Sequence, residues 1–79
     1  MTKPAILESA DLAAFISFRE NILPQPFVNA QGRVCFRFND DITASVEAFY
    51  ANEPTPIADY CQKLKLIRSM IFNMKGGRR

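Results

Sequence analysis

The 79-residue chain contains no histidine and no tryptophan, and only two cysteines and three glycines. Without histidine it lacks the commonest general base and the commonest metal ligand in proteins. Cys35 and Cys61 are too few for a disulfide framework and too far apart for a Cys-x-x-Cys pair, so both are predicted to be reduced thiols. No glycine-rich phosphate loop or recognisable nucleophile motif is present. We therefore expect a protein that is not an enzyme and that uses no metal, no cofactor and no small-molecule substrate.

Long hydrophobic runs are also missing. No segment approaches the roughly 20 apolar residues of a membrane helix, and residues 1–8 lack the pattern of a signal peptide. These absences predict a cytoplasmic protein without membrane contact. The composition is 48% hydrophobic with seven phenylalanines, which predicts a packed core. A single domain of this length has a marginally sufficient core, so self-association is a plausible source of additional stability.

Charge is divided sharply along the sequence. Residues 1–59 contain all eight acidic and four basic residues, a net charge of −4. Residues 60–79 contain six basic and no acidic residues, a net charge of +6. Such a segment can bind phosphate, an acidic partner, or the acidic part of a second copy.

The local pattern predicts three helices and two strands. Ser9 can cap a helix from Ala10 to about Asn21, and Pro24 and Pro26 end it. Residues 27–28 and 33–38 are expected to form a hairpin, with Gly32 in the left-handed position of its loop. Within the second strand, Val34, Phe36 and Phe38 fall on one face, and Arg33, Cys35 and Arg37 on the other.

The two remaining helices follow this hairpin. The second is expected at about 41–51, capped by Asn39 or Asp40. The third is expected at about 56–75, because Thr55-Pro56 is a start signal and Gly76-Gly77 a stop signal. The sequence thus predicts a small α+β domain over residues 9–75, a β-hairpin packed on three helices with a long last helix. Residues 1–8 are expected to be an N-terminal extension, and residues 76–79 a flexible basic tail.

The third helix has several apolar faces. Its expected core face consists of Ile57, Tyr60, Cys61, Leu64, Ile67, Ile71 and Met74. Leu66 and Met70 lie on another side, four residues apart, and are candidates for contact with a second subunit. Alternatively, both residues contact the other helices of their own chain.

A basic stripe also follows this helix. Lys65, Arg68, Phe72 and Lys75 recur at steps of three, four and three, and Arg78 and Arg79 continue the stripe. Cations beside an aromatic ring are typical of nucleic-acid contacts. The alternative is a solvated helix face whose long side chains cover the core.

Two smaller groups of residues have structural explanations beside functional ones. Cys35 between Arg33 and Arg37 is either an anion site with a reactive thiol or part of an edge strand protected by its charges. Asp40 and Asp41 are better explained as caps at a helix start than as a catalytic carboxylate pair.

Four segments carry a resemblance to a known family: residues 11–15, 32–40, 46–50 and 64–72. They resemble a family of very small uncharacterised bacterial proteins that is classed as a domain of unknown function. The likeness spans about residues 9–72 and implies the order helix, hairpin, helix, helix. It implies no activity and no site residues, and Pro24 and Pro26 depart from the family's pattern.

Together these features predict a non-catalytic binding or accessory protein that acts through protein contacts, including its own dimer. The alternative function is a small nucleic-acid-binding regulator that uses the basic stripe.

Overall fold

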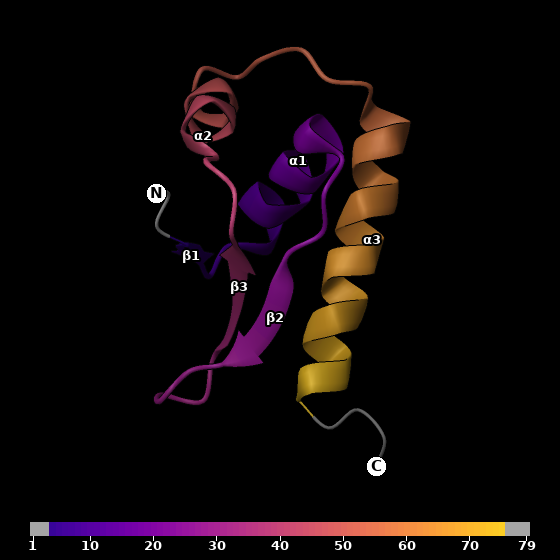
Figure 1. Cartoon of the computed structure of the whole chain (residues 1–79). Coiled ribbons are helices and arrows are strands. Elements are labelled where there is room, and N and C mark those ends of the chain that lie inside the picture. Colours follow the sequence, from indigo (N-terminus) through magenta and orange to yellow (C-terminus); the bar gives the residue numbers. More distant parts are fainter. Residues whose placement is uncertain (1–3, 76–79) are drawn as a thin grey trace.

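The computed structural model describes residues 4–75 as three strands and three helices (Figure 1). The strands are β1 (Ala5–Leu7), β2 (Gln25–Val28) and β3 (Val34–Phe38). The helices are α1 (Ala10–Glu20), α2 (Thr43–Tyr50) and α3 (Ile57–Met74). This arrangement confirms the predicted small α+β domain with a long last helix. Residues 76–79, the expected basic tail, lie outside the described residues.

The sheet has three antiparallel strands in the order β1-β3-β2. Ala5 pairs with Phe38 and Leu7 with Phe36, so residues 5–7 belong to the domain and the prediction that placed them in an N-terminal extension was wrong. A strand of three residues is too short to show the alternation by which strands are recognised. β3 is consequently the central strand, and its expected position at an edge is corrected.

The β2–β3 turn follows from Asn29 and Gly32. The Asn29 side-chain oxygen accepts hydrogen bonds from the backbone amides of Gln31 (2.9 Å) and Arg33 (3.0 Å). Gly32 has φ +81°, the left-handed conformation expected of it.

The core lies between the sheet and α1. Val34, Phe36 and Phe38 on one face of β3 are buried, as their alternation predicts. In α1 every residue from Leu12 to Ser17 is buried, because this helix packs against both α2 and α3 (Figure 1). The short side chains of Ala13 and Ala14 allow these neighbours to approach closely.

The helix ends agree with the predictions to within about two residues. The Ser9 hydroxyl accepts from the Leu12 amide (3.1 Å), as expected of the first cap. At α2 the residue that serves this purpose is Asp41, which accepts from the Thr43 amide (3.1 Å) and hydroxyl (2.8 Å), so neither Asn39 nor Asp40 is the cap. At α3 the Thr55 hydroxyl donates to the Glu53 carbonyl (2.9 Å) instead of capping the helix.

α3 lies along one side of the molecule (Figure 1). Little of its surface is buried. Ile67 is its one fully buried residue, and four others pack partly against the core: Tyr60, Leu64, Met70 and Ile71. Ile57, Cys61 and Met74 are exposed, so the predicted core face was too wide. No helix among residues 4–75 has both the length and the apolar character needed to cross a membrane.

Candidate functional site

The outer surface of α3 carries the predicted basic stripe. Lys65, Arg68, Phe72 and Lys75 are all exposed, and the Phe72 side chain retains 63% of its accessible surface. Arg78 and Arg79, the predicted continuation, lie outside the described residues. The structure therefore brings the four described members to solvent on one helix.

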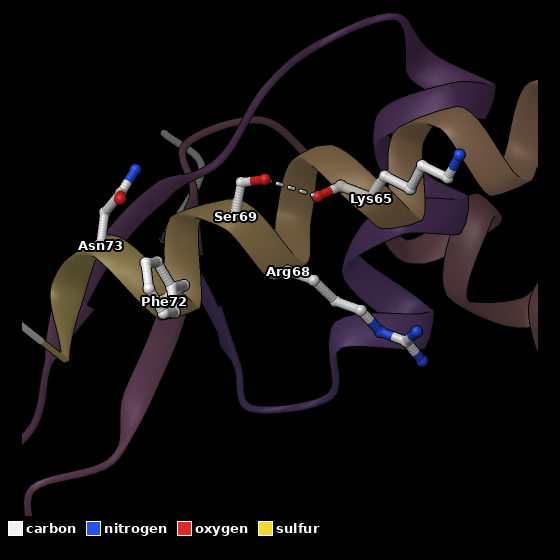
Figure 2. Close-up of a pocket in the computed structure, with 5 residues that line it drawn as sticks. All are labelled: Lys65, Arg68, Ser69, Phe72 and Asn73. Atoms are coloured by element: carbon white, nitrogen blue, oxygen red, sulfur yellow. Dashed lines mark hydrogen bonds between the residues drawn. The ribbon is translucent and has the colours of Figure 1, made fainter. Parts of the chain in front are cut away.

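Three of these residues line a shallow hollow of about 580 Å³ together with Ser69 and Asn73. We call Lys65, Arg68, Ser69, Phe72 and Asn73 the basic face of α3. Figure 2 shows the five side chains projecting from successive turns of this helix. No other element among residues 4–75 contributes to the lining, so within this part of the chain the basic face is open and contacts only one side of a ligand.

Ser69 and Asn73 were not predicted from the sequence as members of this face, although their helical spacing from Lys65 indicates it. They follow Lys65 at four and eight residues, which places them on the same face as the cations. The Ser69 hydroxyl donates to the Lys65 carbonyl (3.0 Å). The Asn73 amide adds two donors and one acceptor at the far end of the face.

The cations of the basic face have no acidic partner within residues 4–75. The ion pairs of the described residues are Arg19 with Glu53 (3.3 Å) and Arg33 with Glu8 (3.5 Å), and neither involves α3. The positive charge of Lys65 and Arg68 is thus directed to solvent. Lys75 lines a separate hollow of about 200 Å³ with residues that include Glu8 and Arg33.

The candidate self-association pair differs in exposure. Leu66 retains 39% of its accessible surface, whereas Met70 is partly buried against the chain's own core. Met70 therefore already has an intramolecular partner, and Leu66 is the member of the pair that can contact a second copy.

Arg33, Cys35 and Arg37 do not form an open anion site. The Cys35 side chain is 2% exposed, and the Asn29 amide donates to its sulfur (3.4 Å). Arg33 pairs with Glu8, and Arg37 donates to the Asn39 side-chain oxygen (3.2 Å). The exposed thiol of the chain is Cys61.

The Asp40–Asp41 pair is explained by the cap at α2. The backbone amide of Thr43, and secondly its hydroxyl, lower the pKa of the Asp41 carboxyl by donating to its charged form. A carboxylate held ionised in this way suits a helix start better than proton transfer.

A polar cluster joins α1 to α2 and was not predicted. Ser45 is fully buried, accepts from Arg19 (3.1 Å) and donates to Glu20. Arg19 also binds Glu53 beyond the end of α2. These contacts fix α2 and the start of the following loop against α1.

Burial raises the pKa of Tyr60, which packs α3 against α1. The charge of Asp11 raises it further, while Arg68 acts in the opposite direction. The Tyr60 hydroxyl donates to the Asp11 carbonyl (3.2 Å), which ties the beginning of α3 to the beginning of α1.

Comparison with known protein families, curated proteins and solved structures gives no match to this chain, so its resemblance to a bacterial family of unknown function stays a prediction.

Proposed function

We propose that this chain is a cytoplasmic, non-catalytic binding domain whose basic face binds single-stranded nucleic acid. The observation that carries the proposal is Phe72, a largely exposed ring that lines the same hollow as Lys65 and Arg68, two cations with no acidic partner within the described residues. Exposing such a ring to water is unfavourable, and a ligand that covers it recovers this cost.

The chemistry of the basic face matches that of a polynucleotide strand. Lys65 and Arg68 supply charge for phosphate oxygens, and Ser69 and Asn73 supply neutral hydrogen-bonding groups. Phe72 supplies a flat apolar surface on which a base can stack. All three kinds of contact occur within three turns of one helix.

The openness of the basic face favours an extended ligand. A hollow with walls on a single helix leaves most of a small molecule in water, whereas small-molecule sites enclose most of their ligand. A single strand needs contact along one side only, and its unpaired bases are accessible for stacking. We therefore favour a single strand over a duplex.

The charge distribution along the chain supports the same ligand. Residues 60–79 carry six basic and no acidic residues, and the one acidic residue of α3, Asp59, lies in its first turn. The field around α3 beyond that turn is therefore positive. Such a field accelerates encounter with a polyanion and makes binding salt-dependent.

Fluorescence anisotropy with labelled mixed-sequence single strands tests the proposal. We expect the affinity to fall steeply as the salt concentration rises. A plot of the logarithm of the binding constant against the logarithm of the salt concentration should have a slope of about −0.7 per phosphate contact. Lys65→Gln and Arg68→Gln should each make the slope shallower by about 0.7, because each removes one contact. Phe72→Leu should weaken binding roughly tenfold with little change of slope, because leucine cannot stack.

Arg37→Gln is the matched control, since it removes one exposed positive charge from the sheet instead of from α3. It should leave the affinity close to that of the unaltered chain. Equal losses of affinity for Arg37→Gln and Arg68→Gln would mean that the strand is attracted by the charge of the whole domain. That result would contradict binding at the basic face. Preference for duplex over single strand would contradict stacking on Phe72.

Self-association through α3 is a second candidate, supported by the exposure of Leu66 beside Met70. Light scattering should then give the mass of a dimer at both low and high salt, because the contact is apolar. Leu66→Glu should reduce that mass to a monomer's. A monomer in the unaltered chain would end this candidate without affecting the basic face.

A further inference from the structure

A second hollow, of about 400 Å³, lies where α1, α2, α3 and the segment joining α2 to α3 meet. It shares no lining residue with the basic face. Four of its lining residues are aromatic, Phe15, Phe49, Tyr50 and Tyr60, and Glu53 is the charged one. We call this hollow the aromatic pocket.

The rings of the aromatic pocket are held at steep angles to one another. Phe49 meets Phe15 edge-on, with centroids 5.5 Å apart and planes at 64°, and meets Tyr50 at 5.2 Å and 89°. The hydrogen bond from Tyr60 to the Asp11 carbonyl fixes a further ring from α3. Rings from α1 and α2 therefore form walls in different orientations, and Tyr60 adds a ring from α3. Tyr50 is 73% exposed.

Glu53 is placed at the pocket by the way α2 ends. Asn52 adopts the left-handed conformation with φ 61°. The Asn52 amide donates to the Phe49 carbonyl (3.1 Å), and the Glu53 amide donates to the Ala48 carbonyl (3.1 Å). These two bonds form a Schellman motif, which satisfies carbonyls at the helix end and fixes the chain that follows.

The carboxylate of Glu53 has capacity left for a ligand. Its Oε2 accepts from Arg19, while Oε1 accepts no hydrogen bond from the described residues, and the side chain is 43% exposed. Glu53 is the one charged side chain among the lining residues of the aromatic pocket, whereas the charged side chains that line the basic face are the cations Lys65 and Arg68.

We propose that the aromatic pocket binds an alkylated ammonium group. The faces of aromatic rings carry negative electrostatic potential and attract organic cations. The methyl groups of such a cation suit apolar walls, and its charge is complementary to the Glu53 carboxylate. An anionic ligand would be repelled by the ring faces and by the Glu53 carboxylate.

The chain provides its own reporter for this site. It has two tyrosines and no tryptophan, and both tyrosines line the aromatic pocket, so intrinsic tyrosine fluorescence reports on this pocket. We would titrate the full chain with choline and with its uncharged carbon analogue, 3,3-dimethylbutan-1-ol. We expect a saturable change with choline at an affinity at least about tenfold above that of the alcohol.

Substitutions in the pocket separate charge from shape. Tyr50→Leu should weaken choline binding about tenfold, while Tyr50→Phe, which keeps the ring, should stay within about twofold. Glu53→Gln should weaken it about threefold or more, with folding checked by circular dichroism because this change also alters the contact with Arg19. Lys65→Gln, on the basic face, should have no effect.

Equal affinities for choline and the alcohol would overturn the proposal, because they would indicate a merely apolar pocket. Absence of a saturable change with choline would overturn it as well. If choline binds, a peptide with trimethyl-lysine tests whether the alkylated ammonium group belongs to a protein or to a small molecule. Tighter binding of the peptide than of choline indicates a modified protein partner, and the reverse indicates a small molecule.

Discussion

α1 and α3 place their residues in opposite environments. α1 has 11 residues, six of which are buried in succession, whereas α3 has 18 residues with one buried. The longer helix thus has fewer buried residues. The number of buried residues, and not the length of a helix, indicates how much it contributes to the stability of the fold.

The difference follows from side-chain size and position. α1 lies between α2 and α3, and its alanines and Ser17 present short side chains to these neighbours. Among the described residues, α3 contacts α1 and β2 on one side, so most of its surface is available for other contacts. We therefore expect substitutions in α1 to change the free energy of unfolding, and those on the outside of α3 to change binding.

The largest effect concerns the free energy of unfolding when the same side chain, an isoleucine, is shortened in each of the two helices. Ile16 is fully buried in α1, and Ile57 is 76% exposed in α3. Ile16→Ala should lower the free energy of unfolding by about 2–5 kcal/mol, because it leaves a cavity. Ile57→Ala should change it by no more than about 0.5 kcal/mol. Urea denaturation followed by circular dichroism measures both.

A domain of this size has little stability to lose, so Ile16→Ala can unfold it entirely. Ile16→Val provides the milder test, with an expected loss of about 0.5–1.5 kcal/mol. Similar losses for Ile57→Ala and Ile16→Val would show that the start of α3 is packed as firmly as α1, which would contradict the comparison.

A smaller effect should come from removing a serine hydroxyl in the two environments. Ser45→Ala removes the buried partner of Arg19 and Glu20 at the contact between α1 and α2, and should cost about 1–3 kcal/mol. Ser69→Ala removes an exposed hydroxyl that donates within α3, and should cost nothing because alanine is the better helix former. Urea denaturation at neutral pH compares the two, and equal effects would argue against the polar cluster.

The sequence predicted the elements whose signals are local. Ser9 as a cap, Gly32 in its turn and the alternation of Val34, Phe36 and Phe38 all depend on neighbouring residues, and all agree with the structure. β1 was not predicted because three residues are too few to show the alternation of a strand, and because its pairing with β3 joins distant parts of the sequence. The same omission made β3 look like an edge strand.

The basic face was only partly predictable for a related reason. Helical spacing places Lys65, Arg68 and Phe72 together, and the structure agrees. Spacing does not show which arc of α3 meets the core, so Ile57 and Cys61 were expected inside and lie outside. The aromatic pocket was missed entirely, because its residues come from three helices that become neighbours only in the fold.

The smallest expected effect concerns the pH dependence of the contact between α1 and α3. Burial, and then the charge of Asp11, raise the pKa of Tyr60. A raised folded-state pKa contributes stability that is fully present below the unfolded value of about 10 and is lost as the pH rises through the folded value.

In Tyr50→Phe, where Tyr60 is the remaining tyrosine, absorbance near 295 nm should therefore give a titration midpoint above about 10. The stability difference between this variant and Tyr50→Phe/Tyr60→Phe should shrink over the same pH range. A midpoint at or below the ordinary tyrosine value would mean that water reaches Tyr60 freely, and that α3 is attached to α1 even more loosely than its burial indicates.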